Sequence, residues 1–294
     1  MGILTKNLLW SMALYRKDIF DKRLGKEVIT FNNKKIRTSK KHLHTCADPF
    51  LFVENDSLYM FYESQIVGEV GQISVIITRD LKDFKEIRGL LKEDFHLSYP
   101  FVFRQNLSIF MIPESAEANE VILYKFSDFP TKIERCKTLL TGFYVDTSVI
   151  SHNGTWYLFT TSKLGLEIYF TDDIENTKLV AHPNSPISSD PRYQRNGGGP
   201  VLIENNLYRI AQDCSTAYGS NLNILKIKNL SKNHYEEEIF VENYFDCDLT
   251  INKKGGHHLS IAKFKGESII AIDGKHEDYL LNKFISPIFK LMNN

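Results

Sequence analysis

The chain has few cysteines, and no two of them lie close together in the sequence. Its 294 residues include four cysteines, Cys46, Cys136, Cys214 and Cys247, and no CxxC motif. Structural zinc sites and disulfide frameworks use more closely spaced or more numerous cysteines. The pattern therefore argues against both, and because isolated thiols suit a reducing compartment, we expect the protein to be cytoplasmic.

Long apolar runs are missing as well. No stretch approaches the roughly 18 consecutive apolar residues that a membrane-spanning helix needs, so the sequence predicts no transmembrane segment. The first 20 residues, MGILTKNLLWSMALYRKDIF, hold a short apolar run, but charged residues follow quickly and no small-residue cleavage site is present. We interpret this stretch as part of the mature protein.

The sequence also lacks an excess of charge of one sign. Its 36 Lys and Arg residues balance 36 Asp and Glu residues, whereas a protein that binds many phosphates along a nucleic acid carries a basic face. We therefore expect no nucleic-acid polymer among its partners. The hydrophobic fraction of 43% is that of a globular protein with a packed core.

What the sequence does contain is a repeated strand, turn and strand pattern. Its five copies are DPFLFVENDSLYMFYES, YPFVFRQNLSIFMIPES, VDTSVISHNGTWYLFTTS, GGPVLIENNLYRIAQDCS and a looser GHHLSIAKFKGESIIAIDG. They begin near residues 48, 99, 146, 199 and 257, at intervals of about 50 residues, which is typical of propeller blades. The sequence thus predicts an all-β fold, a single five-bladed β-propeller domain over residues 1–294.

A third strand follows each of the first four hairpins, at residues 72–80, 121–129, 166–174 and 222–230, where apolar positions alternate or run continuously. A β-sandwich also produces short, evenly spaced strands. It would not repeat the same hairpin five times, so the propeller is the better interpretation.

Two aspartates occupy equivalent positions where blades one and three begin. Asp48 in CADPF and Asp146 in YVDTS each precede an apolar strand, and the first strands of propeller blades line the central channel. Two carboxylates that converge there can act as general acid and general base once their environments separate their pKa values. The structural alternative is that each aspartate only caps backbone N–H groups.

The second strands end in polar couples, namely Glu63-Ser64, Glu114-Ser115, Thr161-Ser162 and Gln212-Asp213. Because side chains alternate across a strand, one member of each couple should face the channel. Glu114 and Asp213 are therefore further candidates for a catalytic acid, and Gln212 is a candidate for substrate binding. Hydrogen bonding between blades is the alternative role.

The segment SSDPRYQRNGGGP, residues 188–200, precedes blade four and differs from its counterparts in the other blades. Exposed backbone N–H groups and the guanidinium groups of Arg192 and Arg195 could bind an anionic group there. Alternatively, the glycines only permit an awkward turn.

Histidines collect near the predicted strand starts, at His42, His44, His96, His257 and His258. Their spacing matches no established metal motif, so we predict neither a metal site nor a cofactor. Hydrogen bonding to sugar hydroxyls is an alternative to packing, and His96, Tyr99 and His257 are candidate substrate contacts.

Several of these segments carry a family resemblance that covers nearly the whole chain. They are ADPFLF, HLSYPFVF, PES, FYVDTS, DPR and LYRIAQDCSTAYGS. On them the chain resembles the propeller domain at the N-terminus of plant glucosamine inositolphosphorylceramide transferases and of related bacterial proteins. The bacterial members resemble components of surface-polysaccharide biosynthesis, so the resemblance implies a propeller that handles carbohydrate.

More distantly, the layout resembles family forty-three glycoside hydrolases. Their five-bladed propellers carry a catalytic base Asp in blade one and a supporting Asp in blade three, the positions of Asp48 and Asp146. That family places its general-acid Glu at the start of blade four, where this chain has Gly198 and Gly199. If the chemistry is shared, Glu114 or Asp213 would have to supply the acid.

Three hypotheses about function follow. The leading one is a carbohydrate-active enzyme that transfers a glycosyl group from an activated sugar, a phosphosugar or sugar nucleotide, during synthesis of a cell-surface polysaccharide or glycoconjugate, alongside other polysaccharide-assembly enzymes. The first alternative is a furanosidase-like glycoside hydrolase that acts on intracellular oligosaccharide. The second is a non-catalytic glycan-binding module, which the missing acid in blade four favours.

Overall fold

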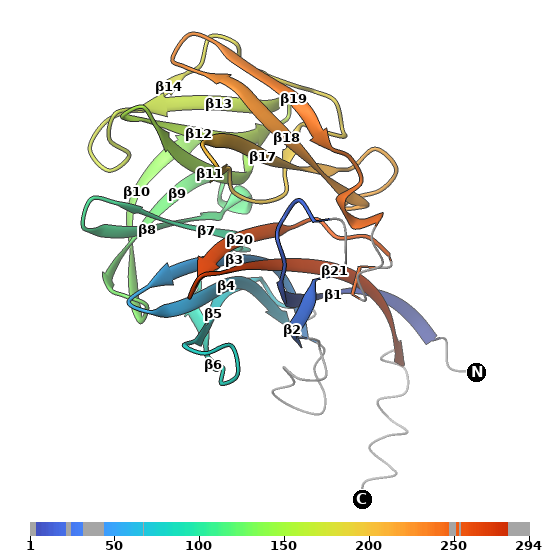
Figure 1. Ribbon diagram of the computed structural model, residues 1–294. Coiled ribbons are helices and arrows are strands. Elements are labelled where there is room, and N and C mark those ends of the chain that lie inside the picture. The colour runs from blue at the N-terminus through green and yellow to red at the C-terminus, as the bar shows by residue number, and fades with distance from the viewer. Residues whose placement is uncertain are drawn as a thin grey trace, which may run out of the picture.

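Five antiparallel sheets make up the computed structural model, which describes residues 4–21, 25–31, 44–66, 68–246, 251–252 and 254–281. Each sheet is one blade, and the blades follow one another around a central axis (Figure 1). The predicted all-β, five-bladed propeller is confirmed. That residues 1–294 form a single domain stays a prediction, and His42 and Cys247 lie outside the described residues.

Blades one to three each use four strands that are consecutive in sequence. Blade one contains β3 (His44–Glu54), β4 (Ser57–Ile66), β5 (Gln72–Thr78) and β6 (Lys85–Leu91). Blade two contains β7 (Ser98–Gln105), β8 (Ser108–Glu114), β9 (Glu120–Asp128) and β10 (Lys132–Thr141), with the 3-10 turn η1 (Ala116–Ala118) between β8 and β9. Blade three contains β11 (Val145–His152), β12 (Thr155–Ser162), β13 (Gly165–Thr171) and β14 (Val180–Ala181).

Blade four has an interrupted first strand. β15 (Arg195–Asn196) and β16 (Val201–Ile203) both pair with β17 (Asn206–Asp213), which continues to β18 (Asn221–Leu230) and β19 (Tyr235–Val241). Gly198 lies within the interruption, where a Cβ would lie 2.1 Å from the carbonyl oxygen of Leu259 in blade five. The glycine thus lets two neighbouring blades approach backbone to backbone near the axis.

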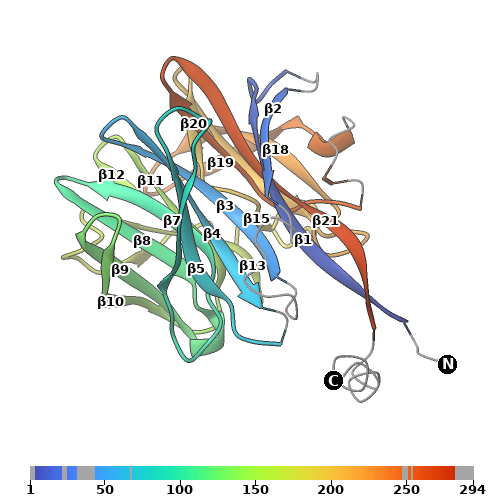
Figure 2. The same ribbon diagram turned by 90° about the horizontal axis from the view of Figure 1, so that it is seen from below.

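Blade five closes the ring, because it combines strands from the two ends of the described chain. Its sheet runs in the order β2 (Lys26–Phe31), β1 (Leu4–Arg16), β21 (Glu267–Leu281) and β20 (Leu259–Phe264). β1 pairs with β21 along its whole length, from Leu4 opposite Leu281 to Arg16 opposite Ile269 (Figure 2). The repeat pattern identified β20 and β21 but did not place the N-terminal strands in this blade.

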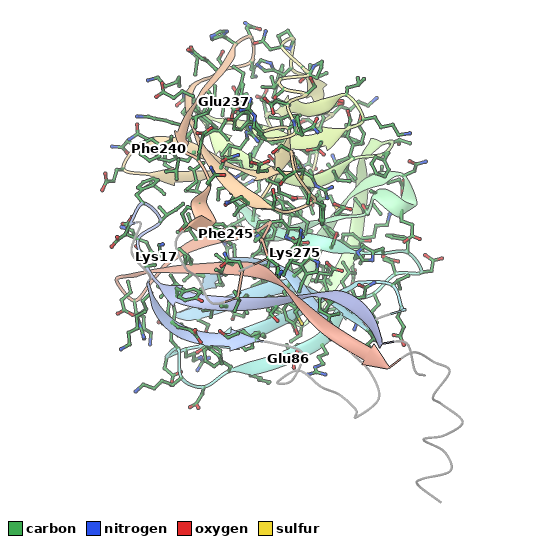
Figure 3. All side chains as sticks on the ribbon, turned by 90° about the vertical axis from the view of Figure 1, so that its right-hand side faces the viewer. Lys17, Glu86, Glu237, Phe240, Phe245 and Lys275 are labelled. Carbon is green, nitrogen blue, oxygen red and sulfur yellow. The ribbon has the colours of Figure 1, made fainter. Side chains whose placement is uncertain are left out.

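Apolar cores lie between neighbouring blades. Phe61 and Ile73 of blade one, for example, share a buried cluster with Met111 and Ile122 of blade two. Phe245 of the 3-10 turn η2 (Tyr244–Asp246) belongs to the cluster between blades four and five (Figure 3). Because both faces of an inner strand are covered in this way, its sequence reads as a nearly continuous apolar run.

The described residues include no helix that is long and apolar enough to span a membrane.

Candidate functional site

The first strands of blades one, two and three share a β-bulge. The pairing of β3 with β4, of β7 with β8 and of β11 with β12 shifts register at the same position in each blade. At the bulges Asp48, Tyr99 and Asp146 have positive φ angles of 54°, 44° and 51°. This backbone conformation is uncommon, above all for a bulky tyrosine, and bulges of this kind redirect side chains near functional sites.

The backbone N–H groups of the bulges bond to carboxylates of neighbouring blades. Tyr99 N donates to Asp48 Oδ2 at 3.1 Å, Asp48 N to Asp273 Oδ2 at 3.3 Å, and Asp146 N to Glu114 Oε2 at 3.2 Å. The capping role considered for Asp48 is thus present in the structure. Capping and chemistry are compatible, because a carboxylate has a second oxygen and further lone pairs.

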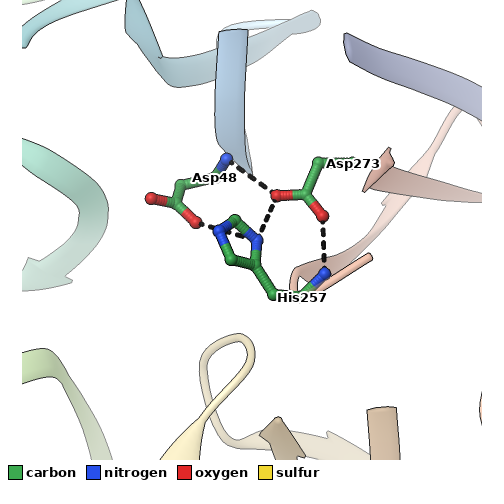
Figure 4. A group of neighbouring side chains, drawn as sticks. All are labelled: Asp48, His257 and Asp273. Atoms are coloured by element: carbon green, nitrogen blue, oxygen red, sulfur yellow. Dashed lines mark hydrogen bonds and ion pairs between the residues drawn. The ribbon is translucent and has the colours of Figure 1, made fainter. Parts of the chain in front are cut away.

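One half of the site is formed by Asp48, His257 and Asp273 (Figure 4). His257 Nδ1 lies 2.5 Å from Asp273 Oδ2 and 3.7 Å from Asp48 Oδ1. Although burial opposes it, the carboxylates of Asp273 and Asp48 raise the pKa of His257 to about 9. Burial raises the pKa of Asp48 to about 8. At neutral pH this half therefore holds a His257–Asp273 ion pair beside a protonated Asp48.

His258 adds a buried neutral imidazole. It is fully buried, its Nδ1 lies 3.6 Å from Asp48 Oδ1, and neither ring nitrogen has a hydrogen-bond partner among the described residues. Burial lowers the pKa of His258 to about 3. Two adjacent histidines thus differ in charge at neutral pH because the ring of His257, unlike that of His258, forms an ion pair with Asp273.

Asp48, His257 and Asp273 also form a donor set for a metal ion, since each offers one ligand atom and these atoms lie within 4.8 Å of one another. Such ligands bind metals in their deprotonated forms. Here Asp273 pairs with the imidazolium and accepts the N–H groups of His257 and His258 at 2.8 and 3.0 Å. A metal ion would have to displace the protons on Asp48 and on the His257 imidazolium. The absence of a metal site stays a prediction.

The other half of the site is formed by Glu114, Asp146, Arg195 and Gln212. Arg195 Nε pairs closely with Asp146 Oδ2, and its Nη2 lies 3.7 Å from Glu114 Oε2. Gln212 Nε2 donates to the same Asp146 oxygen at 3.1 Å. Burial, followed by the adjacent charge of Asp146, raises the pKa of Glu114 well above its usual value. Asp146 is thus the closer counter-ion of Arg195, and the raised pKa favours the protonated form of Glu114.

His96 and Glu63 form a third pair beside Asp48. His96 Nε2 lies 3.3 Å from Glu63 Oε1, and the N–H of Gly71 donates to Nδ1 at 3.0 Å. The bond to Glu63 raises the pKa of His96. Gly71 is required here, because a Cβ would lie 2.6 Å from the imidazole.

Two predicted site residues do not join the cluster. Asp213 follows Gln212 on β17 and therefore faces the other way; its Oδ1 accepts the N–H and hydroxyl of Ser215 at 2.8 and 2.6 Å. Arg192 forms an exposed ion pair with Asp190 at 2.6 Å. Arg195, three residues later, points into the cluster instead.

Asp273 is a member of the cluster that the sequence reasoning missed. It lies within β21, the second strand of blade five, at the position after the hairpin turn that Glu63 and Glu114 occupy in blades one and two. Extending the set of polar couples to the fifth, looser repeat would have found it.

The start of blade four cannot hold an acidic side chain. A Cβ on Gly198 would lie 2.1 Å from a backbone oxygen, and one on Gly199 would lie 2.4 Å from the ring of Phe101. The N–H of Gly198 instead donates to the hydroxyl of Tyr99 at 3.0 Å.

Comparison with known sequences identifies one family. Residues 25–275 match the family described as "Glucosamine inositolphosphorylceramide transferase 1, N-terminal". Glucosamine inositolphosphorylceramide transferase 1 of Arabidopsis thaliana is 34% identical over 250 residues, which cover 78% of this chain and 32% of that protein. The protein of that name from Oryza sativa subsp. indica is 35% identical over 202 residues, covering 65% and 27%. The chain thus spans about a third of these relatives or less.

Comparison with solved structures confirms the fold. A family 43 β-xylosidase/α-arabinofuranosidase from a compost microbial metagenome has a TM-score of 0.58 and 10% identity, covering 79% of this chain and 90% of that one. An α-L-arabinofuranosidase from Clostridium thermocellum has a TM-score of 0.57 and 15% identity, covering 77% and 81%. At these identities the likeness concerns architecture alone.

Proposed function

The chain belongs to the family of the glucosamine inositolphosphorylceramide transferase 1 N-terminal domain, and on that premise we propose that it is an enzyme that transfers a glycosyl group in glycoconjugate synthesis. One observation carries the proposal: Asp48, Glu114 and Asp146 come from three blades and meet at one end of the channel through bulges that the fold repeats. The names of the relatives support the same class of reaction.

The proposed donor is a phosphosugar or a sugar nucleotide, and the acceptor is a sugar hydroxyl of a growing cell-surface polysaccharide or glycoconjugate. A guanidinium can hold a phosphate of the donor, and Arg195 is the arginine that the fold directs into the cluster. A cytoplasmic location and association with other polysaccharide-assembly enzymes belong to the same proposal.

The carboxyl groups have distinct roles in this reaction. In its deprotonated form, whose population grows as the pH rises toward the pKa of about 8, Asp48 accepts the proton of the acceptor hydroxyl as the hydroxyl oxygen attacks the anomeric carbon. The bond from that carbon to the leaving oxygen breaks, and the electron pair goes to the leaving group, to which Glu114 donates its proton. Asp146 holds Arg195 in place and, by its charge, keeps Glu114 protonated.

The test is an assay of sugar nucleotides, phosphosugars and aryl glycosides with the full chain, followed by mass spectrometry. A product heavier than the acceptor by one sugar residue is expected. Asp48→Asn and Asp146→Asn should each lower turnover by about two orders of magnitude, the usual scale for lost acid–base catalysis. Asp172→Asn is the control, because Asp172 is 70% exposed and its ion pair in the described part of the chain is with Lys232. Equal turnover in all four proteins would contradict the proposal.

A second candidate is the non-catalytic glycan-binding module. The observation that favours it is the close packing around Gly198, which leaves no room for the acid that hydrolases of this architecture carry at that place. The same packing weighs against a furanosidase-like hydrolase. Saturable binding of an oligosaccharide, with no release or transfer from any of the donors, would select the binding module.

A further inference from the structure

Lys275 is a nearly buried cation with no counter-ion in the described part of the chain. It lies on β21, two residues after Asp273, and is 6% exposed. Its Nζ donates to the carbonyl oxygen of Tyr218, and no carboxylate in the described part of the chain lies within ion-pair distance. Burial lowers the pKa of Lys275. A buried ammonium is costly unless an anion balances it, so the structure calls for an anion here.

Two aromatic rings surround the ammonium group. Lys275 Nζ lies 5.3 Å from the ring centroid of Trp10 and 5.7 Å from that of Tyr218. The imidazolium of His257 stacks on Trp10 with centroids 3.9 Å apart. The Arg195 guanidinium lies 5.0 Å from the ring centroid of Tyr218. Three cations therefore gather around Trp10 and Tyr218.

The charges around these rings do not cancel. Asp146 pairs with Arg195, and Asp273 pairs with His257. Burial raises the pKa of Asp48 to about 8 and raises that of Glu114 well above its usual value, which favours the uncharged forms of both groups. Lys275 is thus the cation of this group that has no carboxylate at ion-pair distance among the described residues.

Tyr218 offers an accessible ring beside this charge. It is 48% exposed and lies in the loop between β17 and β18, within the LYRIAQDCSTAYGS segment. The next residue, Gly219, has a φ of 58°, and a Cβ there would lie 2.9 Å from the Cβ of His257 and 3.1 Å from the Trp10 ring. The glycine therefore lets the loop pack onto Trp10 and His257, which fixes the position of Tyr218.

We propose, resting on the function proposed above, that Lys275 and Arg195 flank an anion subsite that takes the phosphate of an activated sugar, with Tyr218 as the surface on which the attached ring stacks. Phosphate suits two cations because it offers several acceptor oxygens. Planar aromatic faces suit the apolar face of a sugar or a nucleobase. A carboxylate sugar shares the negative charge, so the experiment separates it from phosphate.

The test is calorimetry on the full chain with four probes: inorganic phosphate, N-acetylglucosamine 1-phosphate, N-acetylglucosamine and glucuronate. The two phosphates should bind more tightly than the neutral sugar and glucuronate. Lys275→Met should lower the affinity for inorganic phosphate and for the sugar phosphate roughly ten- to a hundredfold, the scale of a lost charge-assisted contact. Lys263→Met, at an exposed lysine of the same blade, should not. Tyr218→Ala should lower the affinity for the sugar phosphate and leave the affinity for inorganic phosphate unchanged.

Two further measurements test the anion subsite independently of the binding affinities. Because it removes a buried unpaired charge, Lys275→Met should melt above the wild type without ligand, and phosphate should narrow the difference. In the unaltered protein, NMR of ¹⁵N-labelled lysine should show the pKa of Lys275 rising when phosphate is added. Equal phosphate affinity in wild type and Lys275→Met, or tighter binding of glucuronate than of phosphate, overturns the subsite.

The outcome is separable from that of the glycosyl-transfer assay. Phosphate binding that depends on Lys275, in a protein that transfers no sugar, supports the subsite and removes the catalytic proposal. Sugar transfer that depends on Asp48, with phosphate binding that is indifferent to Lys275, removes the subsite alone.

Discussion

At the scale of single residues, the protonation of two buried groups links stability to pH. The folded pKa values of Asp48 and His257, about 8 and about 9, both lie above those of the unfolded chain. The folded state therefore binds more protons than the unfolded state between pH 6.5 and 9. The stabilisation is complete for His257 below pH 6.5 and is lost as the pH rises through 9. His258 is neutral in the folded state over this window because burial lowers its pKa to about 3, and in the unfolded chain it loses its proton near pH 6.5.

We expect the free energy of unfolding to fall by about 2–5 kcal/mol between pH 6.5 and 9, since each proton contributes roughly 1.4 kcal/mol per pH unit. Urea unfolding at intermediate pH values measures it. Asp48→Asn, which cannot titrate, should flatten the fall between pH 6.5 and 8. A stability that rises with pH over this window would show that the assigned protonation states are wrong.

Glu114 is the second residue whose ionisation can be tested. Glu114→Gln imitates the protonated acid and keeps an oxygen that can accept the N–H of Asp146. We expect an intact fold and a kcat lower by about two orders of magnitude, because the amide cannot give up a proton to the leaving group. Steady-state kinetics should show little change in KM. An unchanged kcat would leave Glu114 with a structural role alone.

At the scale of elements, the interrupted first strand of blade four depends on a missing side chain. Gly198→Ala would place a Cβ 2.1 Å from the carbonyl oxygen of Leu259, between β15 and β20. We expect a loss of about 1–3 kcal/mol or more, as for overpacking of a tight contact. Gly154→Ala is the matched control, because φ is also positive there but nothing lies within 4 Å. Equal losses in urea unfolding would mean that backbone conformation alone sets the cost.

At the scale of the whole molecule, stability depends on the closure of the ring by β1. Met12 on that strand is fully buried in the cluster that joins blades five and one. Met12→Ala should cost about 2–5 kcal/mol, whereas Leu107→Ala, at a side chain that is 95% exposed, should cost less than about 0.5 kcal/mol.

The same experiment tests whether the ring unfolds as one unit. The chain has two tryptophans, Trp10 in blade five and Trp156 in blade three. If the closed ring is cooperative, the fluorescence of either tryptophan and far-ultraviolet circular dichroism should give the same midpoint for Met12→Ala. An earlier transition at Trp10 would show that blade five opens alone.

The repeat of hairpins, the third strands of four blades and the alignment of Asp48 with Asp146 all follow from the sequence. These features depend on local regularities, namely the alternation of side chains along a strand and the turn residues between strands. Four of the five blades use consecutive strands, so a local pattern was sufficient for them. A local pattern was not sufficient to tell which of Arg192 and Arg195 points into the site, because both lie in the same irregular segment.

Only the tertiary structure decided what completes the site. Blade five joins the two ends of the described chain, so that Trp10 lies against His257 and Lys275, and Asp48 N reaches Asp273 across 225 positions of sequence. No local pattern records such a pairing, because the closure of the ring depends on the packing of all five blades. The pKa values of Asp48, His257 and Glu114 depend in turn on how deeply these side chains are buried and on which charges lie beside them. Tertiary packing sets both, so the sequence alone does not predict them.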